Sequence, residues 1–477
     1  MTSKSASLVA LVSGVVIGAQ AHAQPAPGVH DSNEPHDGIT ESAERQPGST
    51  RVEASTSAGT DAARHAELRA SARRGSVDLS LTGGVDDRAD RQQRGAVVAI
   101  DRASGTSRLA VTGGISDVAL DLAIASVGIQ TRSGGAAWSS GRIDLGNLDH
   151  ELVIGASFTS TSGMSTDTSE DLMHMGVLQR ERRSDHRFLQ AYLKDTLHVI
   201  ETLDVSGGFV FDDWRNLSAI ETIRYGTDEQ MDVHAPHIED MHFSPQLGAL
   251  YRATDHIAVR ASGYRELRAP TVGELYVPLV LDGAVAAANA QLTPESVWAG
   301  EVGPELRIGH LQARSAAFLH EIDSPIASAN GERTNLDHGR VLGVATEASW
   351  RPVEPVLAAV SYTRSSSTIR DAAYAGHELS LVPRHRAAAL LSYDARRVAT
   401  LSGGVRWLGR QYIDAENTRA IRSTTLVDAT ATRAIRRGLA GYVSVENLLD
   451  RRTIAAHDLP AAGRTVQIGV KLDSARF

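Results

Sequence analysis

Short segments in which apolar and polar residues alternate fill this chain from about residue 50 to its end. Between residues 203 and 209, for example, Leu203, Val205 and Phe209 alternate with Asp204 and Ser206. Side chains on a β-strand point to opposite faces in turn, so each such segment predicts a strand with one apolar and one polar face. We count roughly 21 candidate strands, with nothing that divides them into two domains, which favours one large closed antiparallel sheet over a sandwich.

The first 23 residues have the parts of a secretory signal peptide. Lys4 supplies the positive charge, residues 8–19 the apolar segment, and Ala21-His22-Ala23 the small-residue cleavage site. The apolar run is shorter than the ~20 residues of a membrane-spanning helix, and no later segment approaches that length. Export followed by strands that are apolar on one face predicts a transmembrane β-barrel in the outer membrane of a Gram-negative bacterium, surrounded by outer-membrane lipid.

Composition narrows the remaining classes. A net charge of -9 leaves no basic stripe for nucleic acid, and the absence of cysteine excludes a disulfide framework and a thiolate metal site. Residues 24–49 are polar and rich in Pro and Gly, which predicts a disordered segment ahead of a barrel over residues 50–477. Longer links at 161–186, 226–242, 271–295 and 323–340 alternate with short ones, which predicts long extracellular loops and short periplasmic turns.

One histidine-rich segment is the only candidate for a metal site. His234, His237 and His242 stand among three carboxylates, and imidazoles with carboxylates can bind transition metals. Their spacing through Pro236 fits no standard ligand pattern, so a polar extracellular loop is the favoured interpretation. The sequence has no nucleophile elbow, phosphate-binding loop or zinc-protease motif, and we predict neither an enzyme nor a bound cofactor.

Three stretches resemble segments of the TonB-dependent outer-membrane receptors, which are gated importers of scarce, bulky nutrients. The first contains Leu267-Arg268-Ala269-Pro270, similar to an FRAP-type motif with Leu in place of Phe. The second is Asn289-Ala290-Gln291-Leu292 with Pro294-Glu295, similar to the NPxL…PE signature. The third covers the closing strands from 410 to 472 and includes the NLxD turn, Asn447 to Asp450.

This resemblance covers roughly residues 50–477 and implies a barrel of about 22 strands. It further implies uptake of siderophore-bound iron, a cobalamin-like ligand or an oligosaccharide. A histidine expected of haem receptors is absent from residues 271–288, which disfavours haem. Taken by themselves the motif residues suit structural roles: Pro270 and Pro294 at strand ends, where no N–H is needed, and Asn447 and Asp450 in a turn.

Two departures from the family pattern affect the expected partners. Family members carry an N-terminal plug domain, yet only residues 24–49 separate the cleavage site from the first strand, fewer than the ~40 that an isolated domain usually needs. We therefore expect no plug here, and contact with the energy-transducing inner-membrane complex only if a plug is supplied elsewhere. Phe477 is terminal, as the barrel-assembly machinery requires in this family, but it is out of phase with the outward-facing set Val466, Ile468, Val470 and Leu472.

The leading hypothesis is thus an importer barrel, truncated and without its own plug. The alternative is a passive porin-like or structural outer-membrane barrel with no energised gate. A secreted soluble β-protein, such as an adhesin or hydrolase, is disfavoured because such a domain has no reason to repeat the order of the motifs above.

Overall fold

The structure is a computed structural model that describes residues 50–59, 64–74, 76–87, 91–104, 107–121, 125–145, 148–171, 176–225, 229–235, 237–276, 279–281, 284–395, 398–451 and 463–474. The predicted signal peptide, the predicted disordered segment 24–49 and Phe477 lie outside these ranges.

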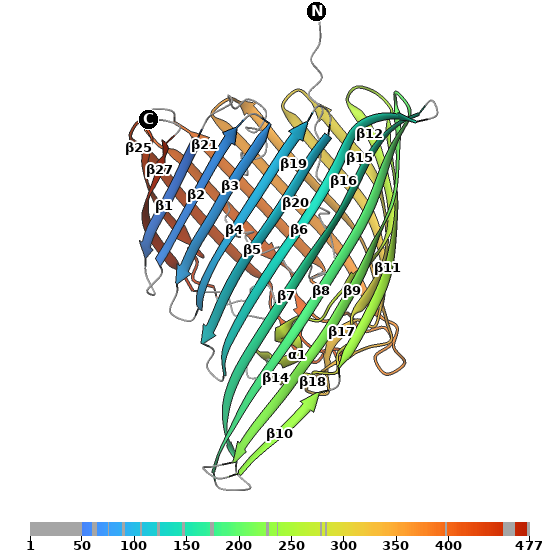
Figure 1. The fold of residues 1–477 in the computed structure, drawn as a ribbon, viewed down its shortest axis with the longest axis vertical. Coiled ribbons are helices and arrows are strands. Elements are labelled where there is room, and N and C mark those ends of the chain that lie inside the picture. Colours follow the sequence, from blue (N-terminus) through green and yellow to red (C-terminus); the bar gives the residue numbers. More distant parts are fainter. Residues whose placement is uncertain are drawn as a thin grey trace, which may run out of the picture.

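Within the described residues, 20 strands close into one antiparallel barrel (Figure 1). The first half of the ring contains β1 (Thr50–Gly59), β2 (Arg64–Arg74), β3 (Val77–Asp87), β4 (Arg91–Ser104), β5 (Ser107–Asp121), β6 (Ala125–Leu145), β7 (Leu148–Asp171), β8 (Gly176–Ile200), β9 (Leu203–Tyr225) and β11 (Ile238–Arg252). The second half contains β12 (Ile257–Arg268), β15 (Glu295–Ile308), β16 (Leu311–Asp323), β19 (His338–Val353), β20 (Val356–Ile369), β21 (His385–Asp394), β22 (Thr400–Leu408), β25 (Thr424–Arg436), β26 (Leu439–Glu446) and β27 (Thr465–Asp473).

The ring closes where the first strand meets the last. β1 pairs with β27 from Glu53 opposite Asp473 to Gly59 opposite Gln467. β10 (Glu229–Ala235) also pairs with β9, beyond the part of β9 that pairs with β11, so β10 and β11 share one position in the ring. The predicted closed transmembrane-type barrel is confirmed, with 20 strands against the roughly 22 expected.

The outer face of the wall is apolar. Val98 and Ile100 of β4 are each 43% exposed, and Leu109, Val111 and Ile115 of β5 continue the same surface. Large apolar side chains at this exposure are costly in water but favourable against lipid chains. Within the described part of the chain, no helix is long and apolar enough to cross a membrane.

Two segments predicted as loops are strands. Residues 161–171 belong to β7 and 176–186 to β8, and most of 226–242 belongs to β10 and β11. On β8 the outward side chains change from Leu189, which is 50% exposed, to the exposed Arg187 and Asp185. Strands beyond the apolar band have polar side chains on both faces, so the alternation that signals a strand is absent there. These strands form a wall that extends well past the other strands (Figure 1).

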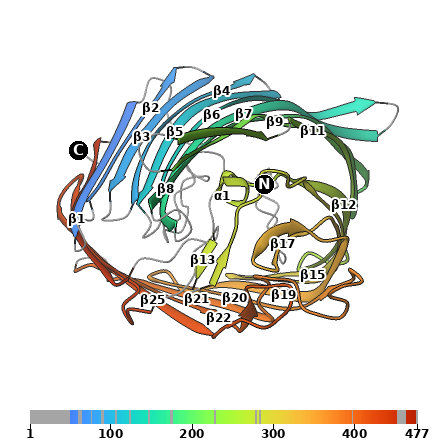
Figure 2. The ribbon, with the colours of Figure 1, turned by 90° about the horizontal axis from the view of Figure 1, so that it is seen from below.

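The two rims differ in their connections. At one rim the described turns are short, and Gly309 and Gly438 adopt φ values of 54° and 72° there, a left-handed conformation that glycine accepts without strain. At the other rim the second half of the ring has long connections at 269–294, 324–337, 370–384 and 409–423. These contain α1 (Val272–Tyr276), β13 (Leu279–Leu281), β14 (Ala284–Ala286), β17 (Ile326–Ala329), β18 (Glu332–Asn335), β23 (Gln411–Tyr412) and β24 (Ala420–Ile421). Viewed along the barrel, α1, β13 and β17 lie inside the ring (Figure 2).

Candidate functional site

The four long connections, which we call the loop layer (269–294, 324–337, 370–384 and 409–423), are joined to one another inside the mouth of the barrel. The first is bonded to the second through the backbone: Ala287 N–H donates to Gly331 O at 2.8 Å, and Arg333 N–H donates to Ala287 O at 3.0 Å. The side chain of Asn289 adds a bond to Arg333 O at 2.9 Å. The predicted motif residue Asn289 therefore joins two loops that are far apart in sequence.

The remaining loops continue this series. Ala415 N–H donates to Ser328 O at 2.8 Å, which joins the second loop to the fourth. The amide of Asn417 bonds both backbone groups of Glu378, accepting from its N–H at 2.7 Å and donating to its O at 2.9 Å, which joins the fourth loop to the third. His377 Nδ1 also donates to Ala415 O at 2.9 Å.

Beneath the loop layer lies the largest apolar core among the described residues. Val341 and Ile369 of the wall are 0% exposed, as is Ala415 of the fourth loop, and Phe318 is 2% exposed. Ala327 and Leu379 contribute from the second and third loops. Burying a valine, leucine, isoleucine or phenylalanine side chain stabilises a structure by about 1.5–3 kcal/mol, so the layer is held by packing as well as by hydrogen bonds.

The predicted motif residues Arg268 and Glu295 meet in a buried ion cluster. Arg268 Nε donates to Glu295 Oε2 at 2.7 Å, and Arg268 Nη1 donates to Glu274 Oε1 and Oε2 at 3.1 and 3.0 Å. The three residues are 5%, 8% and 7% exposed for Arg268, Glu274 and Glu295. Glu295 also accepts from the N–H of Ile326, which starts β17. Pro270 and Pro294 lie just after β12 and just before β15, so both motifs stand where the wall passes into the loop layer.

Glu274 also fixes the start of α1. Thr271 Oγ1 accepts from Glu274 N–H at 3.1 Å, and Glu274 Oε2 accepts from Thr271 N–H at 2.8 Å, which together form a capping box. Burial alone would raise the pKa of Glu274, but the Arg268 guanidinium and these bonds hold the pKa at about 2. Glu274 was not singled out in the sequence, although the pattern Thr271-x-x-Glu274 carries the capping signal.

α1 packs against the inner face of the projecting wall, which is the part of β7, β8 and β9 that extends past the other strands. Tyr276 O accepts from Ser165 Oγ of β7 at 3.1 Å, and Tyr276 Oη accepts from Asn216 Nδ2 of β9 at 2.8 Å. Burial raises the pKa of Tyr276 to about 12, so its phenol is neutral. Trp214 and Leu275 are 2% and 1% exposed in the same apolar cluster.

Asn447 and Asp450 form the turn after β26. Both adopt left-handed backbone conformations, with φ of 49° and 52°. Asn447 Nδ2 donates to Arg451 O and its Oδ1 accepts from Arg451 N–H, both at 2.9 Å, while Asp450 Oδ1 accepts from Arg464 N–H at 2.8 Å. These bonds hold the two ends of the connection together.

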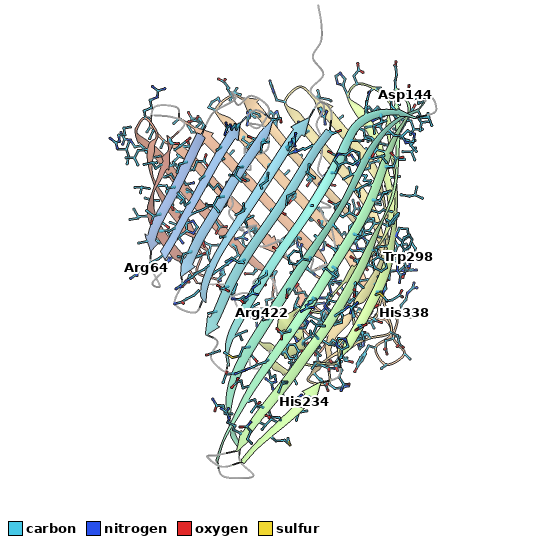
Figure 3. All side chains as sticks on the ribbon, in the orientation of Figure 1. Arg64, Asp144, His234, Trp298, His338 and Arg422 are labelled. Atoms are coloured by element: carbon cyan, nitrogen blue, oxygen red, sulfur yellow. The ribbon has the colours of Figure 1, made fainter. Side chains whose placement is uncertain are left out.

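The candidate metal ligands His234 and His242 lie on opposite faces of the wall, as their paired residues show. His234 pairs with Ile220, whose side chain is 36% exposed, whereas His242 pairs with Asp212, which is 3% exposed. His234 lies near the end of the projecting wall (Figure 3), and His237 Nε2 bonds Glu239 Oε1 at 2.6 Å. Across the described residues, no group of three or more His, Asp or Glu side chains is arranged to hold a metal ion.

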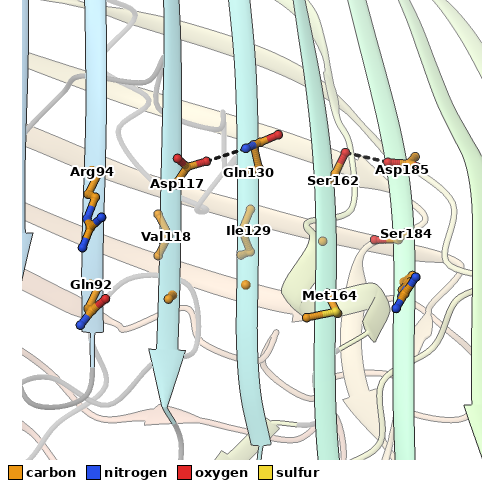
Figure 4. A pocket seen from close by; sticks show the side chains of 14 residues that line it. Gln92, Arg94, Asp117, Val118, Ile129, Gln130, Ser162, Met164, Ser184 and Asp185 are labelled. Carbon is orange, nitrogen blue, oxygen red and sulfur yellow. Dashed lines mark hydrogen bonds between the residues drawn. The ribbon is translucent and has the colours of Figure 1, made fainter.

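A depression of about 660 Å³ lies on the outer face of β4 to β8 (Figure 4). Asp117, two residues beyond the outward Ile115, lines it together with Gln130, Ser162 and Asp185. Gln130 Nε2 donates to Asp117 Oδ1 at 2.9 Å, and Ser162 Oγ donates to Asp185 Oδ1 at 2.6 Å. These polar groups bond one another, which is typical of a barrel wall that continues beyond the apolar band.

The comparisons with known proteins agree with this architecture. The family model of the TonB-dependent receptor-like β-barrel matches residues 29–448. No curated protein sequence matches the chain. Among solved structures, the ferric-catecholate import receptor Fiu from E. coli is 13% identical with a TM-score of 0.62, covering 90% of this chain and 82% of that one.

Two further structures are similar. The ferric yersiniabactin uptake receptor FyuA from Yersinia pestis is 14% identical with a TM-score of 0.64, covering 90% of this chain and 81% of that one. The copper transporter OprC is 15% identical with a TM-score of 0.61, again covering 90% and 81%. At these identities the structures show a shared fold, while the family model spans most of the sequence. The chain therefore belongs to the family of TonB-dependent receptor-like β-barrels.

Proposed function

We propose that this chain is the barrel of an importer in the outer membrane of a Gram-negative bacterium, taking up a scarce nutrient such as siderophore-bound iron, a cobalamin-like ligand or an oligosaccharide. The observation that carries the proposal is the loop layer. It is folded inside one mouth of a closed barrel and held there by the Arg268–Glu274–Glu295 cluster and an apolar core. A passive pore gains nothing from so ordered a layer, whereas a receptor needs a defined surface for its ligand.

The similar structures favour a metal-containing ligand. Fiu and FyuA are described as receptors for ferric chelates and OprC as a copper transporter. In this proposal the metal is transported inside its chelate, and the described histidines of the barrel do not bind it. The loop layer and the inner faces of β8 to β12 would contact the chelate.

The proposal also assigns partners. Outer-membrane lipid covers the apolar outer face, and the barrel-assembly machinery inserts the chain. Energised import further requires a plug that contacts the inner-membrane energy-transducing complex.

Uptake measurements test the proposal. Cells that carry the gene should accumulate radioactive iron or copper from limiting medium faster than cells that lack it, and deletion of the energy-transducing protein should abolish the difference. A matched pair of variants locates the effect: Glu295→Gln in the loop layer should impair uptake, whereas Glu67→Gln on β2, whose side chain pairs with Arg69 far from the loop layer, should not. Uptake that is unaffected by the transducing protein would refute an energised importer.

A passive pore is the second candidate, favoured by one observation. The inner face of β4 and β5 carries charged side chains such as Asp101 and Arg108, which bond each other beside a wet interior. In planar bilayers the purified chain should then give a large, steady and unselective conductance. A conductance that depends on the presence of a plug-containing protein would instead support the importer.

A further inference from the structure

The inner face of β8 and β9 carries a histidine that is buried without hydrogen bonds. His186 is 6% exposed, and neither of its ring nitrogens has a hydrogen-bond partner among the described residues. Ser184 Oγ beside it and Asn216 Oδ1 opposite it are buried and unpartnered in the same way. Buried polar atoms are nearly always bonded in native proteins, so four unbonded ones from three residues on adjacent strands call for an explanation.

α1 is the element that covers this histidine. The rings of His186 and Tyr276 lie 5.8 Å apart and tilted, and the ring of His186 also stacks on Trp214 with the centroids 6.1 Å apart. α1 reaches this position as part of a connection, held by the Arg268–Glu274 bonds at one end and by Tyr276 on the wall at the other. Removing α1 from the wall would let water reach His186, Ser184 and Asn216.

We infer that α1 is an acid-released cover over the inner face of β8 and β9, with His186 as its proton sensor. An imidazolium needs acceptors for two N–H groups, and among the described residues no acceptor lies within hydrogen-bond distance of either ring nitrogen while α1 covers the site. Protonation therefore favours the state in which α1 has left the wall. Release uncovers an imidazole, a carboxamide, a hydroxyl and the Trp214 ring at the barrel mouth.

Among the described groups around His186, the imidazole is the only one that titrates in this range. From α1, Tyr276 is a neutral phenol, and the pKa of Glu274 is about 2, so both keep their charge state between pH 4 and pH 7. Thr161 of β7 and Asn216 of β9 are neutral, while Arg183, Asp185 and Arg187 of β8 point to the opposite face of the wall. Arg215 of β9 also points outward, where it pairs with Asp213.

The direction of the effect follows from linkage. Burial lowers the pKa of His186 to about 4 from an ordinary value near 6.5, with the charge of Asp185 opposing this only in part. The contribution of His186 to the covered state is thus fully present above the ordinary pKa and is lost as the pH falls from about 6.5 towards 4. Between pH 7.5 and pH 4.5 the ratio of uncovered to covered molecules should rise by more than about tenfold.

The absence of cysteine makes a direct test possible. Ser165→Cys places a thiol under α1, where Ser165 is 3% exposed, and Ser162→Cys places one on the exposed outer face of the same strand. Each purified, refolded full chain is reacted with dithiodipyridine, which labels thiols at acidic pH. The labelling rate of the Ser165→Cys protein divided by that of the Ser162→Cys protein should rise by more than about tenfold between pH 7.5 and pH 4.5.

Variants of His186 test whether this residue causes the pH response of the labelling rate. His186→Gln should give a slow rate ratio that does not change with pH, and His186→Lys a fast ratio at both pH values. His320→Gln alters another buried histidine, 2% exposed beside Phe318, and should leave the response intact. Heat-modifiable migration establishes that each variant has folded. A rate ratio that is flat in the protein with His186 intact, or that rises equally in His186→Gln, overturns the inference.

Discussion

The two halves of the ring are stabilised in different ways. From β1 to β11 the chain is a series of long hairpins, and Val127, Trp214 and Ile223 are the only buried hydrophobic residues that precede Leu267 among those described. From β12 to β27 no strand is longer than the 16 residues of β19, whereas β6 to β9 have 21 to 25 residues. The loops of this second half are long, and the remaining buried hydrophobic residues gather in and under the loop layer. A wall between lipid and water needs no internal core, because lipid covers its apolar face and neighbouring strands satisfy its backbone. A core forms only where loops fold back on the wall.

This difference predicts where substitutions will matter. The loop layer should respond like the interior of a soluble protein, whereas the first half should tolerate changes to single side chains.

The largest effect is expected at the buried ion cluster. Arg268→Ala leaves Glu274 and Glu295 buried without their cation, which should destabilise the docked loop layer by about 3–5 kcal/mol. The matched change in the first half is Arg108→Ala, where a 51% exposed side chain pairs with Asp101 and the expected cost is below about 1 kcal/mol. Protease resistance of the loops as a function of urea measures both. Equal costs would remove the distinction between the halves.

Packing should show the next largest difference. Ile369→Ala deletes a 0% exposed side chain from the core and should cost about 2–5 kcal/mol. Ile100→Ala on the outer face should cost less than half as much, because lipid chains fill the space that the side chain leaves. Unfolding in lipid vesicles, followed by heat-modifiable migration, compares the two variants. A greater cost for Ile100→Ala would show that the outer face carries more of the stability.

Substituting one glycine in each half of the ring by alanine compares how well the two halves tolerate one added carbon atom. At Gly303 a Cβ would lie 2.7 Å from the backbone of Ala316 and Ser315, so Gly303→Ala should cost about 1–3 kcal/mol. At Gly155 the three atoms nearest to a Cβ all belong to the ring end of Tyr192, which can turn aside, so Gly155→Ala should cost less than about 1 kcal/mol. Urea midpoints of the two variants decide the order, and a larger loss at Gly155 would contradict it.

The last comparison concerns strong acid. The pKa of Glu274 is lowered to about 2 in the folded protein, so its contribution is present above its ordinary pKa and is lost as the pH falls from about 4.5 towards 2. Protease resistance of the loop layer should decline in that window, below the range assigned to His186. Glu274→Gln should remove the decline, and a decline that persists in this variant would assign it to another group.

The sequence predicted strands best where the two faces of a strand meet different surroundings. Val205 and Phe209 opposite Asp204 identify β9 correctly because one face meets lipid and the other meets water. The same reasoning failed at 161–186 and 226–242, where both faces are polar and the strands look like loops. Arg268 and Glu295 were recognised as motif residues, but their contact, and the part of Glu274 in it, were not predicted.

The sequence by itself determined that this chain closes into a barrel, because strands with one apolar face in a membrane must pair until no edge remains. The capping box at Thr271 and the turn at Asn447 were also local, since each depends on bonds over a few residues. Only the tertiary structure decided that four loops would interlock, that Arg268 would meet two carboxylates, and that α1 would bury His186. Apart from Arg268 and Glu274, which are six positions apart, those contacts join residues tens of positions apart, and no local pattern of side chains encodes which of them will be neighbours.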